Sequence, residues 1–257
     1  AAMTYIVLST IKEFPIPLPP LPVQEEIVRI LDNFTELTAE LTAELTARKK
    51  QYEYYRDELL TFGDEVEWKT LGEIATYSKE RIEASELNKE NYIGVDNLLQ
   101  DKRGKTESNF VPTEGRFTKY NPGNILIGNI RPYLRKIWFA DNYGGTNGDV
   151  LVINLKKEKY ICSKFLYYVL SSEEFFYYNI KNSRGAKMPR GNKTMIMKYK
   201  IPIPPLAEQE RIVSILDKFD ALVNDISIGL PAEIEARQKQ YEYYREKLLT
   251  FKELDEK

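Results

Sequence analysis

The chain contains one charged, aromatic segment twice, and this repeat constrains its fold more than any other feature. RKKQYEYYRDELLTF occupies residues 48–62 and RQKQYEYYREKLLTF occupies residues 237–251, with twelve of the fifteen positions identical. A hydrophobic core does not require two of its elements to share a sequence, because many apolar combinations fill the same volume. The duplication therefore predicts two equivalent structural elements that flank an unlike segment.

The similarity extends upstream of this segment. IPLPPL at residues 16–21 matches IPIPPL at 201–206, and QEEIVRILDNF at 24–34 matches QERIVSILDKF at 209–219. The chain therefore has the order arm, insert, arm. We expect four parts, which are a tail at 1–14, a helical arm at 15–62, an insert at 63–200 and a second helical arm at 201–257.

Both arms are predicted to be helical. Their prolines indicate an extended approach segment, because a residue before proline is driven away from the α conformation. In the first arm, apolar residues then recur at steps of three and four, at Ile27, Ile30, Leu31, Phe34, Leu37, Leu41 and Leu45. Unbroken from Val23 to Phe62, this helix would be roughly 60 Å long at about 1.5 Å per residue. In the second arm we expect a break at Gly229-Leu230-Pro231, where glycine ends one helix and proline starts the next.

A long helix with a narrow apolar stripe needs a partner helix in water, and the other arm is the nearest candidate. We therefore expect the two arms to form an antiparallel coiled coil. Its expected contact residues are Leu37, Leu41, Leu45, Tyr52, Tyr55, Tyr241 and Tyr244. The tyrosines have helical spacing, which favours packing between helices; a patch that stacks on nucleic-acid bases is the alternative interpretation.

The insert differs from the arms in its pattern of apolar residues. WKTLGEIATYS, NYIGVDNLL, GNILIGNIRPYLRKIWFA and DVLVINL are short runs of β type separated by Asn, Gly and Pro, and SKFLYYVLSS and SEEFFYYNIK follow as helical pieces. The expected fold class is α+β, with one mixed α/β domain and two long helices.

Charge is distributed unevenly between these parts. Residues 63–200 hold 23 Lys and Arg against 17 Asp and Glu, whereas the rest of the chain holds 14 against 22. Residues 181–200 contain seven basic residues and no acidic one. A basic region within an acidic chain is the electrostatic pattern expected of contact with phosphates. Solvated surface lysines are the alternative explanation.

Composition also excludes several chemistries. The chain has no histidine and one cysteine, Cys162, so His-based zinc sites, Ser–His or Cys–His nucleophile pairs and intramolecular disulfides are ruled out. GAKMPRGNKT at 185–194 departs from a phosphate-binding P-loop, because five residues separate its glycines and Asn192 precedes Lys193. We predict no catalytic or metal-binding residue. The sequence also shows no membrane span and no signal peptide, so we expect a cytoplasmic location.

The arms and parts of the insert resemble one known family. Residues 201–222, residues 229–251 and the tract ELTAELTAELTA at 36–47 are similar to the conserved regions of specificity subunits of type I restriction–modification systems. NPGNILIGNIRPYLRK at 121–136 and SRGAKMPRGN at 183–192 resemble stretches of that family's target recognition domains.

The resemblance implies a non-catalytic DNA-specificity subunit. A full subunit of the family has two target recognition domains, each reading half of an interrupted DNA sequence, and its conserved helical regions hold them apart as an antiparallel coiled coil. The implied partners are double-stranded DNA, a methylation subunit and a restriction and translocation subunit. S-adenosylmethionine, ATP and magnesium would belong to those subunits, so we expect this chain to bind no cofactor.

Only one such domain is present here. Residues 9–20 resemble the tail of a missing first domain, so we expect either a natural half-length subunit or a truncated form. We expect a homodimer that restores the missing half through a two-fold axis and reads an interrupted palindrome. The ELTA tract would then act as a ruler, because four added residues lengthen a helix by about 6 Å and rotate the next face by roughly 40°. Helix-forming filler is the alternative interpretation of this tract.

Base reading favours Arg, Lys, Asn and Gln, whose side chains pair with base edges. The predicted DNA-binding residues are Asn129, Arg131, Tyr133, Arg135 and Lys136 in one segment, Arg184, Lys187, Arg190, Asn192 and Lys193 in a second, and Lys102, Arg103 and Lys105 in a third. The alternative function is a non-catalytic coiled-coil scaffold or inhibitor that captures partner subunits without specific DNA binding.

Overall fold

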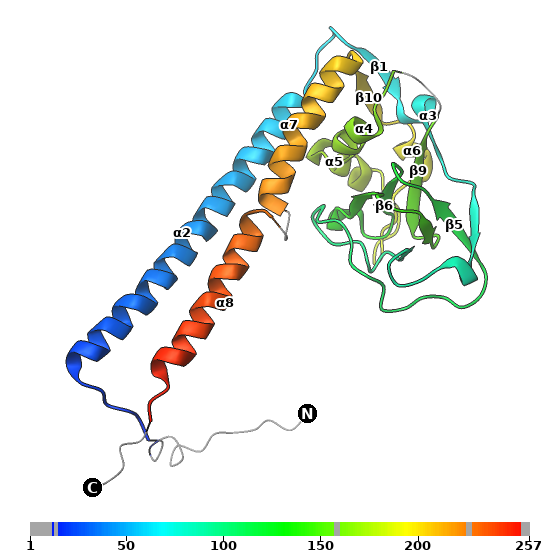
Figure 1. Cartoon of the computed structure of the whole chain (residues 1–257). Helices are drawn as coiled ribbons and strands as arrows, with labels where there is room; N and C mark the ends of the chain where they lie inside the picture. Colours follow the sequence, from blue (N-terminus) through cyan, green and yellow to red (C-terminus); the bar gives the residue numbers. More distant parts are fainter. Residues whose placement is uncertain (1–11, 13–14, 157–159, 225–227, 253–257) are drawn as a thin grey trace. The chain divides into compact units, whose positions relative to one another are not determined.

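The computed structural model describes residue 12 and residues 15–156, 160–224 and 228–252 (Figure 1). The chain divides into two compact units, in which unit 1 holds residues 1–49 and 221–257 and unit 2 holds residues 50–220. Apart from Lys12, the expected tail at residues 1–14 lies outside the described residues. Within the described ranges, no helix is both long enough and apolar enough to span a membrane.

Unit 1 is built from helices. Helix α2 (Leu21–Leu59) is unbroken, close to the expected range of 23–62, and its first part lies beside α8 (Leu230–Leu249) in the opposite direction (Figure 1). The rings of Phe34 and Tyr244 stack across the two helices with 5.4 Å between their centroids. On α2, Leu37, Leu41 and Leu45 recur on one face and are half-buried.

The threonine hydroxyl groups of the ELTA tract form hydrogen bonds to backbone carbonyl oxygens of the same helix. Thr42 Oγ1 donates to the carbonyl oxygen of Thr38 at 2.7 Å, and Thr46 Oγ1 donates to that of Thr42 at 2.9 Å. Thr38 Oγ1 donates in the same way to Phe34 at 2.8 Å. Each threonine is therefore satisfied one turn back along the helix. A tetrapeptide could be added or removed without leaving a hydroxyl group unpaired.

The break expected in the second arm is present. Helix α7 (Leu206–Asn224) lies before it, and residues 225–227 are outside the described residues. Gly229 is the N-cap of α8, and Pro231 lies in the first turn of that helix, as predicted. Proline suits this position because the first amide groups of a helix have no intrahelical acceptor.

Unit 2 contains the α+β domain. Its strands form a two-stranded sheet β1-β10, a four-stranded sheet β2-β9-β6-β7 and a four-stranded sheet β3-β5-β8-β4. The strands are β1 (Glu67–Thr70), β2 (Ala75–Tyr77), β3 (Arg81–Glu83), β4 (Tyr92–Ile93), β5 (Arg116–Tyr120), β6 (Ile125–Gly128), β7 (Ile137–Phe139), β8 (Gly144–Thr146), β9 (Val150–Leu155) and β10 (Lys200–Ile203). The helices are α3 (Leu71–Ile74), α4 (Ser163–Leu170), α5 (Glu173–Lys181) and α6 (Lys193–Ile196), with 3-10 turns η1 (Ala84–Glu86) and η2 (Pro132–Leu134).

The sheet β2-β9-β6-β7 is buried on both faces. Because side chains alternate along a strand, Ile125 and Ile127 of β6 face one core together with Phe165 of α4. Leu126 lies between them in sequence and packs into a second core with Trp138. Burial on both sides explains why ILI and VLVINL are nearly continuous apolar runs rather than alternating ones.

The two copies of the proline-rich segment have different structures. Lys200–Ile203 is strand β10, paired antiparallel with β1, and Ile201 is fully buried. The extended conformation expected for this segment is present, and its pairing with β1 was not predicted. The matching Ile16 and Leu18 lie outside any strand and are 74% and 85% exposed. One copy thus has a partner strand, whereas the other presents its apolar side chains to solvent.

The repeated tyrosines make the same contact twice. Tyr55 stacks on Phe219 in unit 2 with 5.8 Å between ring centroids, and Tyr244 stacks on Phe34 in unit 1 at 5.4 Å. Tyr55 and Tyr244 are equivalent positions of the repeat, as are Phe34 and Phe219. In each unit, the tyrosine of one copy therefore meets the phenylalanine of the other. Tyr52 also lies against Phe219, at 6.3 Å, whereas Tyr241 is half-buried on α8.

Candidate nucleic-acid interface

Three segments of unit 2 carry the basic residues predicted to contact DNA. We name them loop A (residues 100–105), loop B (residues 129–136, which includes η2) and loop C (residues 184–193). They are far apart in the sequence, but backbone hydrogen bonds join loop A to loop B and loop B to loop C. The structure therefore brings all three predicted segments into one continuous surface.

Loops A and B are joined by two backbone hydrogen bonds. The amide of Asp101 donates to the carbonyl oxygen of Leu134 at 3.0 Å, and the amide of Lys102 donates to that of Arg135 at 3.0 Å. Two consecutive bonds of this kind fix both the distance and the register between the loops.

Loops B and C are joined in the same way. The amide of Arg131 donates to the carbonyl oxygen of Pro189 at 2.7 Å, and the amide of Gly191 donates to that of Asn129 at 3.0 Å. A Cβ atom at Gly191 would lie 2.6 Å from Asn179 Oδ1 and 2.8 Å from Asn129 Oδ1. Any side chain at this position would therefore require these two buried amide groups to move.

Loops A and B also contain unusual backbone conformations. Asp101, Lys102, Arg131 and Arg135 have φ angles of 54°, 63°, 52° and 49°, and they are all the non-glycine residues of positive φ in the described part of the chain. This left-handed region is uncommon for residues with a side chain and persists where surrounding contacts impose it. Concentration of such residues in two adjacent loops is typical of a functional surface.

Four of the predicted DNA-binding residues have charged side chains that are exposed to solvent and unpaired within the described ranges. Arg131, Arg184, Lys187 and Lys193 are exposed, and within the described ranges their side chains make no hydrogen bond or ion pair. Tyr133 of η2 is 48% exposed. These five side chains are free to contact a nucleic acid.

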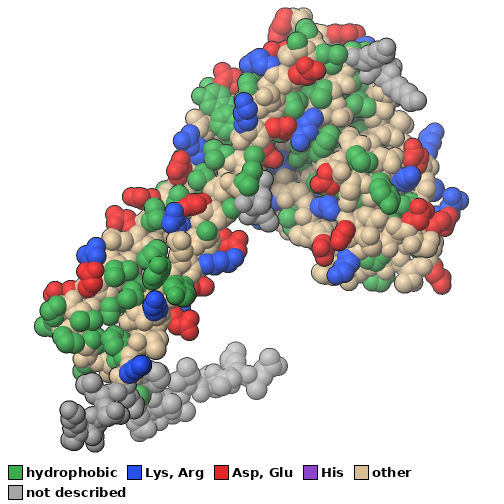
Figure 2. All heavy atoms as spheres, viewed as in Figure 1, with side chains coloured by type: hydrophobic (Ala, Val, Ile, Leu, Met, Phe, Trp, Pro, Cys, Tyr) green, Lys and Arg blue, Asp and Glu red, His purple; other side chains and the backbone are tan. Residues whose placement is uncertain are grey.

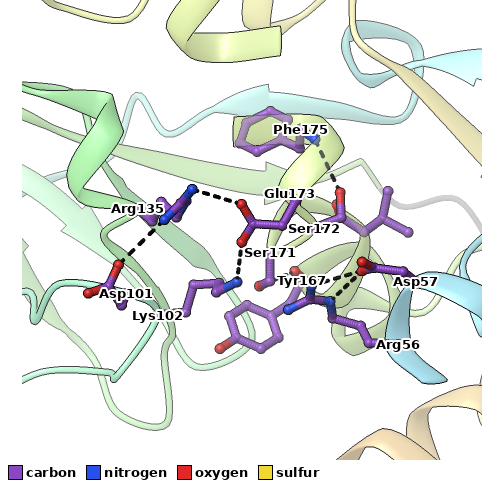
Figure 3. A network of polar contacts seen from close by, with 11 residues as sticks. Arg56, Asp57, Asp101, Lys102, Arg135, Tyr167, Ser171, Ser172, Glu173 and Phe175 are labelled. Atoms are coloured by element: carbon purple, nitrogen blue, oxygen red, sulfur yellow. Dashed lines mark hydrogen bonds and ion pairs between the residues drawn. The ribbon is translucent and has the colours of Figure 1, made fainter. Parts of the chain in front are cut away.

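A second part is held by protein groups. Lys102 Nζ lies 2.8 Å from Glu173 Oε1, and Arg135 Nη2 lies 3.0 Å from Glu173 Oε2 (Figure 3). Arg135 also lies 3.7 Å from Asp101. Burial, followed by the positive charge of Arg56, lowers the pKa of Lys102, although Glu173 partly offsets this. Lys102 and Arg135 were predicted from sequence as DNA contacts, and the structure places them in an internal ion-pair network.

Two further lysines are engaged with carbonyl oxygens. Lys136 Nζ donates to Val95 at 2.7 Å, and burial lowers the pKa of this lysine. Lys105 Nζ donates to Glu90 at 2.9 Å and lies 5.1 Å from the centre of the Trp138 ring. Both lysines therefore hold neighbouring backbone or aromatic groups in this structure.

Asn129 and Asn192, the two predicted asparagines, lie in different environments. Asn129 is buried, and its Oδ1 has no hydrogen-bond partner among the described residues. Asn192 is the N-cap of α6, where Oδ1 accepts from the amides of Thr194 at 3.1 Å and Met195 at 3.3 Å. Capping uses the same oxygen atom that would pair with a base.

The two remaining arginines make weak contacts. Arg103 Nε donates to the carbonyl oxygen of Gln100 within loop A at 3.1 Å. Arg190 Nη2 lies 3.3 Å from Asp149, and its backbone is paired in both directions with that of Arg184. These guanidinium groups are exposed and could exchange such contacts for phosphate oxygens.

Four residues of these ion pairs were not predicted from the sequence, namely Arg56, Asp57, Asp101 and Glu173. Glu173 is the first residue of α5, and Arg56 of α2 is 1% exposed and donates to Asp57 Oδ1 at 2.8 and 2.9 Å (Figure 3). The only sequence signal for Arg56 was its presence in QYEYYR, where it reads as a solvated helix charge. Glu173 could have been recognised as a helix N-terminal acid, but its cationic partners lie in distant loops.

The surface shows both signs of charge. In Figure 2, acidic and basic side chains are interspersed over the face in view. Among the residues that the structure describes, no group of three or more His, Cys, Asp or Glu is arranged to hold a metal ion. The candidate interface is therefore an arrangement of Lys, Arg and Tyr side chains on three connected loops.

Comparison with known families identifies the class of protein. A family model described as the type I restriction modification DNA specificity domain matches residues 1–48 and 63–236. The chain belongs to this family, as the resemblance of its arms and insert predicted.

Individual relatives support the same assignment. The chain is 40% identical over 259 residues to the EcoR124I/EcoR124II specificity subunit of Escherichia coli, and the match covers 93% of this chain and 63% of that protein. It is 31% identical over 240 residues to a protein of Mycoplasma pneumoniae whose name describes a type I specificity subunit, covering 90% of this chain and 91% of that protein. The chain thus spans less than two thirds of the E. coli relative and most of the M. pneumoniae one.

A solved structure shows the same fold. The S subunit of a type I restriction-modification system from M. genitalium superposes with a TM-score of 0.60 at 16% identity, covering 96% of this chain and 66% of that one. The mixed helix and sheet fold expected from the sequence is confirmed.

Proposed function

We propose that this chain is the non-catalytic DNA-recognition subunit of a type I restriction–modification complex and reads one half of a bipartite target. The observation that carries the proposal is the convergence of loops A, B and C. Backbone hydrogen bonds assemble them into one surface on which Arg131, Arg184, Lys187 and Lys193 present free charges. Family membership and the names of the relatives support the same role.

The predicted residues differ in exposure and contacts, which supports three roles: base contact, phosphate contact and stabilisation of the loops. Arg131 and Tyr133 lie on the strained turn of loop B, where a fixed backbone can aim a side chain at a base edge. Arg184 and Lys187 lie on the exposed part of loop C and suit phosphate contacts. The remaining lysines and one arginine contact protein groups and so stabilise the loops; they are Lys102, Lys105, Arg135 and Lys136.

Replacing Arg131 with alanine tests this proposal. The expected loss for a base contact is about 1–3 kcal/mol, or roughly 5- to 150-fold in affinity, with relaxed preference at one base position. Selection of bound sequences from a random DNA library, followed by titration of the selected site, measures both quantities. Arg116→Ala in β5 is the matched control, since it also removes an exposed arginine but lies in none of the three loops. Equal behaviour of the two variants would contradict the proposal.

Unit 1 supports a role in assembly. Its exposed apolar residues include Ile16, Leu18, Leu21, Tyr243 and Leu249, and Figure 2 shows hydrophobic side chains gathered over α2 and α8. Exposed apolar patches of this kind mark interaction surfaces. We propose that the helices form the antiparallel coiled coil of the family, join two copies of this chain and scaffold the methylation and restriction subunits in the cytoplasm. S-adenosylmethionine, ATP and magnesium would then be bound by those subunits.

The ELTA tract and the dimer can be tested together. A homodimer should select two inverted copies of one half-site at a fixed spacing, and deleting residues 40–43 should change that spacing. The reason is that four residues of helix account for about 6 Å and roughly 40° of rotation. The measurement is the motif recovered by library selection with the purified chain, alone and with its methylation subunit. A single half-site would exclude the dimer, and unchanged spacing would exclude the ruler. Capture of the methylation subunit without any selected DNA would favour the scaffold alternative.

A further inference from the structure

The carboxylate of Glu173 contacts two loops of the candidate interface, loop A and loop B. It is the first residue of α5, a nine-residue helix whose N-cap Ser172 accepts from the amide of Phe175 at 3.2 Å. The unpaired amides at a helix N-terminus favour a negative charge there. The helix N-terminus therefore stabilises the negative charge of Glu173, and the carboxylate oxygen atoms can bind cations.

The two oxygen atoms of Glu173 contact different loops. Oε1 lies 2.8 Å from Lys102 Nζ of loop A, and Oε2 lies 3.0 Å from Arg135 Nη2 of loop B (Figure 3). These cations come from the same two residues whose backbones are joined at 3.0 Å. Both residues also have left-handed φ angles, 63° for Lys102 and 49° for Arg135. One side chain thus ties together the strained positions of both loops.

The electrostatics around Glu173 are unbalanced in favour of positive charge. Burial alone would raise the pKa of its carboxyl group, but the hydrogen bond from Lys102 and the charges of Lys102, Arg135 and Arg56 lower it overall. Asp57 is the partner of Arg56, and Asp101 lies farther from Arg135 than Glu173 does. Without Glu173, Lys102 would therefore lose its ion-pair partner and Arg135 the closer of its two.

We infer that Glu173 is a positioning residue that holds loops A and B in register and masks two cations, so that it sets the ratio of specific to non-specific DNA binding. This inference rests on the proposed function. Non-specific binding to DNA is largely electrostatic and grows with the number of free cations, whereas specific binding requires fixed side chains. One acidic residue that restrains two cations therefore lowers the first and supports the second.

The test is Glu173→Gln, which keeps the shape of the side chain and removes its charge. Non-specific affinity for a duplex without the target should rise, and the slope of log K against log salt should steepen by up to about 1.8, or roughly 0.9 for each released cation. Affinity for the selected target should fall, so the specificity ratio decreases by about tenfold or more. Binding of both duplexes by the purified chain across a salt series measures all three effects.

Glu174→Gln is the matched control. Glu174 follows Glu173 in the first turn of α5 and is exposed, so the variant makes the same change in net charge at the same helix end. It makes no ion pair with loop A or loop B among the described residues. We expect its salt slope and specificity ratio to match those of the unmodified chain. Equal effects from the two variants would show that net charge alone is responsible and would overturn the inference.

Amide hydrogen exchange in the free protein separates this inference from the proposed function. Glu173→Gln should accelerate exchange at Lys102 and Arg135, and Glu174→Gln should not. If the unmodified chain prefers no DNA sequence, the proposed function fails, and exchange then decides the positioning role alone. If the Gln variant does not fold, Glu173→Asp keeps the charge and shortens the side chain. It should accelerate exchange without steepening the salt slope, and unchanged exchange would refute the positioning role.

Discussion

Replacing Arg56 with alanine should lower the free energy of unfolding by about 2–4 kcal/mol, the range for truncating a large buried side chain. Arg56 is 1% exposed, lies 5.8 Å from the Tyr52 ring and donates twice to Asp57. Truncation leaves a cavity beside the ion-pair network. Asp57 is half-exposed and can be solvated, so the loss comes from packing more than from an uncompensated charge. Urea denaturation measures the change.

The repeat provides a matched control for this variant. Arg245 is the equivalent residue in the second copy and lies 5.6 Å from the Tyr241 ring, but it is exposed. Arg245→Ala should therefore change stability by no more than about 0.5 kcal/mol, as is usual for surface substitutions. Similar losses for the two variants would contradict the different burial of these equivalent arginines.

Replacing Gly144 with alanine should unfold unit 2 or destabilise it by more than about 4 kcal/mol, in the range reserved for severe steric conflicts. A Cβ atom at Gly144 would lie 1.9 Å from the carbonyl oxygen of Asn91 and 2.5 Å from the hydroxyl oxygen of Tyr120. The first of these atoms belongs to the backbone and cannot rotate away. Because β8 pairs with both β4 and β5, the sheet would have to separate at its centre.

Gly148→Ala is the control for this substitution. Gly148 lies four residues farther along the chain, and a Cβ atom there would meet no heavy atom within 4 Å. Its melting temperature should remain within a few degrees of that of the unmodified chain, because about 1 kcal/mol shifts it by roughly 2–4 °C in a domain of this size. A folded Gly144→Ala protein with the same melting temperature would show that β4 and β8 are not packed as described.

Long, strongly patterned elements could be predicted from the sequence. The stripe from Ile27 to Leu45 predicted α2, and the glycine and proline near residue 230 marked the start of α8. The apolar runs of β6 and β9 predicted strands because burial on both faces makes them continuous.

Short strands escaped prediction for physical reasons. The RFTKY run of β5 is mostly polar and half-buried, two of the three residues of β8 are glycine, and β10 contains Pro202. These segments are strands because of their neighbours rather than their own propensities. Pairing between distant segments decides such elements, and periodicity along one segment does not report it.

The candidate interface could be predicted in part. Charge and turn residues identified loops A, B and C, but not which cations are free. Lys102 and Glu173 are 71 residues apart in the sequence, so their ion pair exists only after the fold has formed. Arg131 and Arg135 looked alike as residues of GNIRPYLRK, yet one is exposed and the other contacts Glu173.

The reciprocal stacking of Tyr55 on Phe219 and of Tyr244 on Phe34 has a consequence for self-recognition. Because both contacts use the same pair of residue types in the same sequence context, a copy of the repeat cannot distinguish its own chain from another. The linkage within one molecule favours the internal pairing through a high effective concentration. We expect exchange of arms between molecules to compete with the internal pairing as protein concentration rises, because it requires no new surface. Sedimentation across a concentration series would measure this exchange.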